Sequence, residues 1–424
     1  MKQPESRQAP SAMPLTHSSP SQTPMLAKRW TAELRGWLDE SASRAGFDVV
    51  GLASVGSPDE PVAQILAARF EAWVDAGHAG EMEYLKRRDE AGTLLRGALQ
   101  VAIPWVRTVV VCALNFNAQK PRSIDPAPSG SGWIARYAWT GSALDGGGSA
   151  PTDYHSEMLE RLRAIESGLL ARADCTTRCY VDTGPILERS VAAEAGVGWI
   201  GKNTCLINPQ LGSWILLGVL VTSLPADEEV VSLPAPDRCG SCTRCIEACP
   251  TGALLGEQSV TAPRTMAAER CIAYLTIEKK GVIDASLRAA MGRQVFGCDI
   301  CQDVCPWNRR QQGAAVVSCA ESASRVEDFR WNSLQPRAEL VNPKLEWLGA
   351  MDAREFKRWF KGSPLQRTGR KRLLRNVAIA MGNSGEQRYL AQLEAWAASD
   401  DLVLSETAEW ARARTLQVGV RNRR

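Results

Sequence analysis

Eight cysteines in two runs constrain the middle of this 424-residue chain more than any other feature. The first run, from Cys239 to Pro250, has the spacing C-x2-C-x2-C-x3-C-P, and the second, from Cys298 to Pro306, repeats the end of it as C-x2-C-x3-C-P. In two-cluster bacterial ferredoxins, the fourth cysteine of such a run binds the other cluster. The second set then needs one more ligand, and Cys271 stands upstream to supply it.

The spacing therefore predicts two [4Fe–4S] clusters with crossed ligands. The first cluster is expected on Cys239, Cys242, Cys245 and Cys305, and the second on Cys249, Cys271, Cys298 and Cys301. Paired C-x2-C motifs also bind zinc, but the count of eight and the two Cys-Pro endings favour clusters. The five remaining cysteines are interpreted as free thiols in a reducing cytosol: Cys112, Cys175, Cys179, Cys205 and Cys319.

Positive charge is concentrated near the C-terminus. Residues 354–376 contain nine Lys or Arg and one acid, a local balance of +8, although the whole chain carries only +3. Such a segment indicates contact with an anionic partner, and the alternative is a solvated helix face.

The composition, with 45% hydrophobic and 23% charged residues, is that of an ordinary globular protein. The first residues are rich in Pro and Ser and have no apolar core of a secretion signal, so residues 1–28 are expected to form a disordered tail. No stretch approaches the ~18 apolar residues of a membrane span. A cytoplasmic protein without membrane contact is therefore expected.

The fold class expected from the periodicity is α+β with three domains. Helices at 30–45, 62–76, 154–172 and 188–195 alternate with strands at 47–53, 107–114 and 214–223 and a strand ending at 180–182, which makes residues 29–233 a mixed α/β domain. A ferredoxin-type domain covers 234–310 and a connector covers 311–335. Residues 336–424 read as helices at 353–361, 367–381, 386–399 and 405–415, which form either one HEAT-like unit or a plain helical cap.

Asp182 ends a strand and is followed by a Thr-Gly-Pro turn and a helix. One interpretation is a turn or N-cap aspartate. The other is a proton donor that faces a cleft, with a pKa raised by burial. The sequence pattern alone leaves both open.

Several longer stretches together resemble the epoxyqueuosine reductase family. They are residues 180–189, 196–204, 270–280 and 374–383, with the cysteine runs that close on Cys-Pro-Trp-Asn-Arg309. The likeness covers roughly residues 30 to 400. Members of this family reduce the epoxide of epoxyqueuosine, the precursor of queuosine at the wobble position of tRNA.

The resemblance implies base-off cobalamin as a third cofactor, bound by the domain at 29–233, with Asp182 as proton donor above the cobalt. Residues implied to touch cobalamin are Ala135, Arg136, Asp182, Leu206, Leu217 and Ala273. The family's Arg-x-x-Pro pattern is absent between residues 86 and 101, which leaves Arg87, Arg88 and Arg96 as candidates for a cofactor contact. The HEAT-like domain at 336–424 is implied to bind the tRNA, and the tRNA contacts assigned are Lys280, Arg370, Lys371, Arg372 and Arg375.

The expected function is therefore reduction of epoxyqueuosine in tRNA by a monomer that receives electrons from an external low-potential donor. Two alternatives are kept. A reductive dehalogenase-like reductase would share cobalamin and two clusters, but it normally carries a twin-arginine signal and no basic helical C-terminus. A ferredoxin-like electron carrier would leave the first domain and the basic segment without a role.

Overall fold

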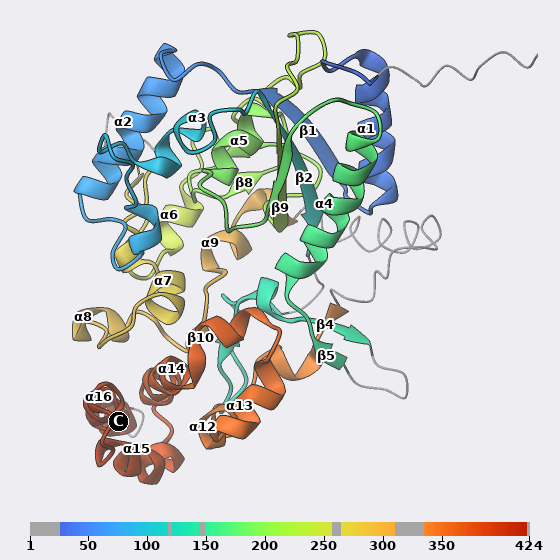
Figure 1. Cartoon of the computed structure of the whole chain (residues 1–424). Helices are drawn as coiled ribbons and strands as arrows, with labels where there is room; N and C mark the ends of the chain where they lie inside the picture. The colour runs from blue at the N-terminus through green and yellow to red at the C-terminus, as the bar shows by residue number, and fades with distance from the viewer. Residues whose placement is uncertain (1–25, 118–120, 144–148, 257–263, 310–334, 422–424) are drawn as a thin grey trace, which may run out of the picture.

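The computed structural model describes residues 26–117, 121–143, 149–256, 264–309 and 335–421. Figure 1 shows the elements in three tiers, with a sheet and its helices above, the cysteine-rich segment in the middle and the C-terminal helices below. Most of the expected tail and nearly all of the connector lie outside the described residues. Within the tail expected at 1–28, Ala27 pairs with Ala173 in a β-bridge, so ordered chain begins before residue 29.

The upper tier is built on a four-stranded antiparallel sheet with the order β1-β2-β9-β6. The strands are β1 (Val49–Ser54), β2 (Thr108–Asn115), β9 (Ile215–Thr222) and β6 (Thr177–Tyr180). Helices α1 (Ala32–Arg44) and α4 (Tyr154–Leu170) cover one face, and α5 (Glu188–Glu194) covers the other. Because both faces are covered, β2 is apolar at nearly every position and buried throughout except at its end.

Local sequence explains where these elements start and how close they lie. The Thr31 hydroxyl accepts the Leu34 N–H at 3.2 Å and begins α1, whose buried face includes Leu38. At Gly51 in β1, an added Cβ would meet the Ala195 carbonyl oxygen at 2.0 Å, so only glycine lets the end of α5 approach the sheet this closely. The remaining elements of this tier are α2 (Pro61–Asp75), α3 (Leu99–Ala102), β7 (Trp199–Ile200) and β8 (Leu206–Ile207).

The helices and strands expected before residue 233 are therefore present, each within a few residues of its expected limits. The mixed α/β character is confirmed. Periodicity did not predict the small strands β3 (Trp133–Ile134), β4 (Thr140–Ala143), β5 (Ser149–Pro151) and β11 (Gln335–Pro336), nor the helix α12 (Leu345–Ala350). The four helices expected after residue 352 are present as the last four helices of the chain's described part.

The middle tier consists of short helices that start in or near the cysteine runs. They are α6 (Arg244–Ala248), α7 (Ile272–Ile277), α8 (Ala285–Arg288), α9 (Ile300–Asp303) and α10 (Pro306–Arg309). A short strand here, β10 (Gln294–Phe296), pairs in parallel with β3 (Trp133–Ile134) of the preceding region. No strand was expected at either place, because two or three residues give no detectable alternation.

The lower tier contains α12 (Leu345–Ala350), α13 (Ala353–Phe360), α14 (Gly369–Ser384), α15 (Leu390–Ala397) and α16 (Leu402–Arg421). Helix α14 is central, and residues 373–382 are all buried between α16, α12 and β10. Ile134 and Phe296 belong to the same hydrophobic core as these helices. A three-stranded sheet of β11 (Gln335–Pro336), β4 (Thr140–Ala143) and β5 (Ser149–Pro151) borders this tier. Within the described ranges, no helix has both the length and the apolar character needed to cross a membrane.

Candidate active site

The first predicted cluster set lines one cavity. Cys239, Cys242, Cys245 and Cys305 border a cavity of about 230 Å³. Trp199 donates its indole N–H toward the Cys239 sulfur at 3.5 Å and packs edge-on against Trp307, with the ring centroids 5.0 Å apart. The structure thus brings Cys305 to the first run, although Cys305 is a neighbour of Cys301 in the sequence.

The second set is held together in the same way. Burial raises the pKa of Cys298, and the nearby Cys271 and Cys249 raise it further. Burial also raises the pKa of Cys305, and the thiols that raise it further are Cys239 and Cys205. The surroundings of Cys298 and Cys305 agree with the crossed grouping, which stays a prediction.

A ninth cysteine lies beside the second group. Cys205 hydrogen bonds to Cys301, whereas its sequence context suggested an isolated thiol. Its place directly after the glycine-rich loop at 196–204 was the one available signal. Cys112 is buried, Cys175 and Cys179 are half-buried, and none of the described cysteines forms a disulfide. Cys319 lies outside the described residues.

Asp182 sits two residues beyond β6 in a left-handed backbone conformation, with φ of 55°. Its side chain is 49% exposed. The Tyr154 hydroxyl donates a hydrogen bond to Oδ2 of Asp182, and Nε2 of His155 lies 3.5 Å from the same oxygen. The backbone N–H of Asp182 donates to Oε1 of Glu188 at 2.8 Å, and the two side-chain carboxyl groups are also hydrogen bonded.

The lower tier reaches this site through Arg367. Its Nη1 donates to Nε2 of His155 at 2.9 Å, and Nδ1 of His155 lies 2.5 Å from Oδ1 of Asp153. Because a guanidinium only donates, Nε2 must accept, and the ring proton lies on Nδ1 against Asp153. The N-cap and first turn of α4 are thereby tied to the segment before α14.

The pKa of Asp182 corrects one expectation. Burial acts to raise it, but hydrogen bonds from Glu188 and Tyr154 outweigh burial and leave the pKa of Asp182 below its usual value. Burial and the charge of Asp182 instead raise the pKa of Glu188 to about 9. The raised pKa expected for Asp182 belongs to its neighbour Glu188, which no sequence pattern had marked.

The residues implied to touch cobalamin differ in exposure. Ala135 and Leu206 are buried, while Leu217 and Ala273 are half-buried. Arg136 is 6% exposed, forms an ion pair with Asp303 at 3.3 Å and stacks on Trp214 with 4.1 Å to the ring centroid. Its guanidinium therefore serves mainly to fix the cluster segment to the upper tier. The Nε of Arg136 has no hydrogen-bond partner among the described residues, nor has the buried Nδ2 of Asn203.

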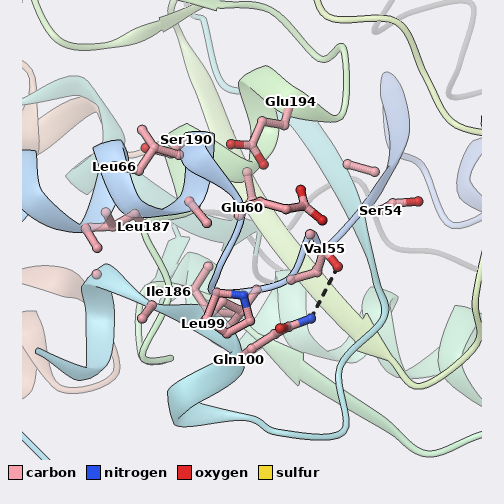
Figure 2. Close-up of a pocket in the computed structure, with 18 of the residues that line it drawn as sticks. Ser54, Val55, Glu60, Leu66, Leu99, Gln100, Ile186, Leu187, Ser190 and Glu194 are labelled. Carbon is pink, nitrogen blue, oxygen red and sulfur yellow. Dashed lines mark hydrogen bonds between the residues drawn. The ribbon is translucent and has the colours of Figure 1, made fainter. Parts of the chain in front are cut away.

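A second cavity of about 440 Å³ lies between the end of β1, α2, the start of α3 and α5. Figure 2 shows apolar side chains such as Ile186 and Leu99 on one side of it, and the carboxyl groups of Glu60 and Glu194 on the other. Helix α5 thus carries Glu188 at the site of Asp182 and Glu194 in this cavity.

The three arginines considered for a cofactor contact lie in different surroundings. Arg96 lines the second cavity. Arg88 instead forms an ion pair with Glu71 at 2.8 Å on the surface, and Arg87 is exposed.

The residues assigned to tRNA are not equally available. Lys280 and Lys371 are exposed, and Lys371 pairs with Asp401 at 3.2 Å. Arg370 and Arg372 are half-buried and donate to backbone carbonyls.

Arg375 is 1% exposed. Its guanidinium donates to the carbonyls of Leu275, Lys279 and Gly281, at 2.6 to 2.7 Å. It fixes α14 to the cluster segment and is not free to meet a phosphate, so the expected tRNA contact at Arg375 is wrong. The residues of the basic segment that are exposed are Arg354, Lys357, Arg358, Lys361, Arg367 and Lys371.

Comparison with known proteins assigns the chain. A family model described as a 4Fe-4S double cluster binding domain matches residues 238–308, which confirms the two predicted clusters. The model described as "Epoxyqueuosine reductase QueG, DUF1730" matches residues 96–183. An epoxyqueuosine reductase of Xanthomonas campestris pv. campestris is 34% identical over 88% of this chain and 93% of its own length.

The chain belongs to the epoxyqueuosine reductase family.

Solved epoxyqueuosine reductases also share its fold. One, crystallised with an epoxyqueuosine-modified tRNA-Tyr stem loop, is 28% identical with a TM-score of 0.72 and covers 90% of both chains. Another, from Bacillus subtilis, has its aspartate catalytic loop swung out of the active site and is 27% identical, with a TM-score of 0.71 and 90% of both chains covered. Membership in the epoxyqueuosine reductase family decides against the dehalogenase-like and electron-carrier alternatives.

Proposed function

We propose that this protein reduces the epoxide of epoxyqueuosine in tRNA to the alkene of queuosine. The reaction takes up two electrons and two protons and releases the epoxide oxygen as water. The observation that carries the proposal is the position of Asp182, a half-exposed carboxyl group held by Tyr154 and Glu188 in a strained loop. Strained backbone at a non-glycine residue persists where the surroundings hold it, which is typical of active sites.

The two clusters supply electrons one at a time, with their ligands on the eight named cysteines. The mouth of the first cavity carries the exposed cations Arg238 and Arg244, which provide a docking area for an acidic external donor. On the other side, Cys205 links the second group of cysteines to the glycine-rich loop. The carbonyl of Thr204 in that loop accepts a hydrogen bond of 2.8 Å from Arg189, the neighbour of Glu188.

Cobalamin fits the residues between these parts. Its corrin carries amide carbonyls, and the buried Nε of Arg136 and Nδ2 of Asn203 are donors without a partner among the described residues. The half-buried Leu217 and Ala273 offer apolar surface. When bound, this cofactor supplies the two-electron chemistry at carbon.

The chain's own residues then handle protons and position. Asp182 delivers a proton to the leaving oxygen, because its carboxyl group is half-exposed at the tip of the loop. The Tyr154 hydroxyl fixes the orientation of that carboxyl group. Arg367 connects this arrangement to the tier that we assign to tRNA.

The assignment to tRNA rests on the exposed cations of α13 and its flanks and on the relative that binds a tRNA stem loop. We place the cobalamin domain at 29–233, the cluster domain at 234–310 and the helical tRNA-binding domain at 336–424. A tRNA substrate implies a cytoplasmic location, and we propose a monomer.

The decisive experiment is single turnover of the reconstituted holoenzyme on epoxyqueuosine-containing tRNA, followed by mass spectrometry of the nucleosides. Conversion to queuosine that depends on both added cobalamin and intact clusters is the expected result. Loss of the epoxide without queuosine, or conversion without cobalamin, would contradict the proposal.

A further inference from the structure

Glu188 is in direct contact with the proposed acid. It opens α5 six residues after Asp182, and the intervening Thr-Gly-Pro turn folds the chain back so that the two carboxyl groups meet. Oε1 of Glu188 also accepts the backbone N–H of Asp182 at 2.8 Å. Because Asp182 is a non-glycine residue at φ of 55°, its loop needs such an anchor to stay in this conformation.

Two carboxyl groups in contact share one proton, because two negative charges at that distance repel each other strongly. The hydrogen bonds decide which group holds it. Asp182 already accepts from the Tyr154 hydroxyl at Oδ2, an arrangement suited to a carboxylate. Nε2 of His155 faces the same oxygen but is itself an acceptor from Arg367, so the ring brings no proton to Asp182.

The remaining donor in the pair is Glu188. Burial together with the charge of Asp182 raises the pKa of Glu188 to about 9, which agrees with this assignment. The titratable and charged groups that face the pair are Tyr84, Arg96, Tyr137, Tyr154, His155 and Arg189. Of these, Arg189 acts on Asp182 and Arg96 on Glu188, and both favour the charged carboxylate.

We propose that Glu188 stores the proton that Asp182 delivers, and that its contact with the Asp182 backbone holds the acid loop in the site. In the step, the proton passes from the Glu188 carboxyl group to the Asp182 carboxylate and from there to the leaving oxygen. Glu188 is left as a carboxylate and regains a proton from water. Glu188 is thus a positioning residue, and this inference rests on the proposed role of Asp182.

The first test is infrared spectroscopy of the resting holoenzyme without substrate. A protonated carboxyl group has a C=O stretch separate from the carboxylate bands. Other carboxyl groups with a raised pKa, such as Glu194 and Asp299, also contribute to this band, so each variant is compared with the wild type by a difference spectrum. We expect the band to lose intensity in Glu188→Gln and to stay unchanged in Glu160→Gln, a matched change at an exposed glutamate of α4. Unchanged intensity in Glu188→Gln would overturn the assignment of the proton.

The second test is the pH dependence of single turnover. Glu188→Gln keeps an acceptor for the Asp182 N–H but cannot release a proton, so Asp182 must be protonated on its own. We expect the variant to lose about 10²-fold or more near neutral pH and to recover as the pH falls. A loss by the same factor at every pH, or no loss, would overturn the proton-storage role.

Two further variants separate the inference from the proposed function. Glu188→Ala removes the anchor as well, so it should be slower than Glu188→Gln even at low pH, and equal rates there would overturn the anchoring role. Full activity of Asp182→Asn would show that the proposed function assigned the wrong acid, which is a different result from any obtained with Glu188 alone.

Discussion

Nη1 of Arg367 donates a hydrogen bond of 2.9 Å to Nε2 of His155, although the two residues belong to different tiers of the molecule. His155 lies against Asp182, and Arg367 lies just before α14. The proposed docking of tRNA on the lower tier would therefore reach the acid through Arg367, which contacts His155 and, at 3.5 Å, Oδ2 of Asp153.

Removing the hydrogen bond between Arg367 and His155 should slow turnover. We expect Arg367→Met, which keeps the side-chain stem, to lower single turnover by up to about 10²-fold, because small displacements of a positioned group carry a penalty of that size. Iron content and cobalamin absorbance should not change. Arg358→Met is the control, since Arg358 is also exposed in the same basic segment but contacts Glu355, at 4.0 Å, and the Trp359 ring instead of the active site. Equal effects of both variants would assign Arg367 to general phosphate binding.

Replacing the acid itself should separate chemistry from folding. Asp182→Asn suits the left-handed backbone, because asparagine adopts positive φ more readily than most residues. We expect this variant to keep its melting temperature and both clusters but to lose about 10²–10⁴-fold in turnover. Asp182→Ala should lose turnover and some stability. If Asp182 serves only the turn, nucleoside analysis will show nearly normal activity in the Asn variant.

The pair of carboxyl groups should make stability depend on pH. The pKa of Glu188 is about 9 in the folded protein, above its ordinary value of 4.5, so the folded state keeps a proton that the unfolded state releases. This group's contribution is full below the unfolded pKa and falls as pH rises toward 9, by up to about 1.4 kcal/mol per pH unit. The melting temperature of Glu188→Gln should therefore rise relative to that of the wild type as the pH increases. For Glu160→Gln, the difference in melting temperature from the wild type should be the same at every pH. The same pH-independent difference for Glu188→Gln would contradict the shared proton.

Crossed ligation predicts which cluster each cysteine supports. We expect Cys305→Ala to damage the cluster bound by Cys239, Cys242 and Cys245, because these four residues line one cavity. Cys298→Ala should damage the other cluster, although Cys298 and Cys305 belong to the same run. Mössbauer or EPR spectra of the two variants should therefore differ. Damage to the same cluster in both would show that each run binds its own.

Substitutions in the basic segment should fall into two classes, those that weaken tRNA binding and those that destabilise the protein. Changing Lys357, Arg358 and Lys361 to Ala should weaken tRNA binding and flatten its salt dependence, by up to about 0.9 in slope for each phosphate that is no longer neutralised. Arg375→Ala should instead destabilise the protein by about 3 kcal/mol, because it leaves buried carbonyls without partners. Filter binding at several salt concentrations and melting curves check both. Unchanged stability of Arg375→Ala would contradict this structural role and would leave Arg375 as a candidate tRNA contact.

The two [4Fe–4S] clusters could be predicted because local spacing determines them. The Cys-Pro runs constrain cluster ligands over a few residues, and Asp182 is marked by the strand before it and the turn after it. The basic segment shows the limit of such reasoning. Its charge indicated an anionic partner, but the count of arginines does not tell which side chains face inward, and Arg375 is buried in α14.

Glu188 shows the same limit at the active site. A glutamate at the first turn of a helix is ordinary, because the helix dipole favours it there. Its contact with Asp182 depends on how the Thr-Gly-Pro turn folds back and on the depth of α5 against β1. Neither is visible in the periodicity of hydrophobic residues, so the raised pKa was expected at Asp182.

The parallel pairing of β3 with β10 also bears on how the protein is made. Strand β3 leaves the ribosome long before β10, and its partner becomes available only after most of the cysteines have been synthesised. Contacts between segments so distant in the chain form slowly. The upper tier can therefore fold during translation, while Trp133 and Ile134 remain unpaired until the cluster segment arrives. Cells short of iron should accumulate a form whose sheet is complete but whose lower tier is open to proteases, with first cleavage between the sheet and α14.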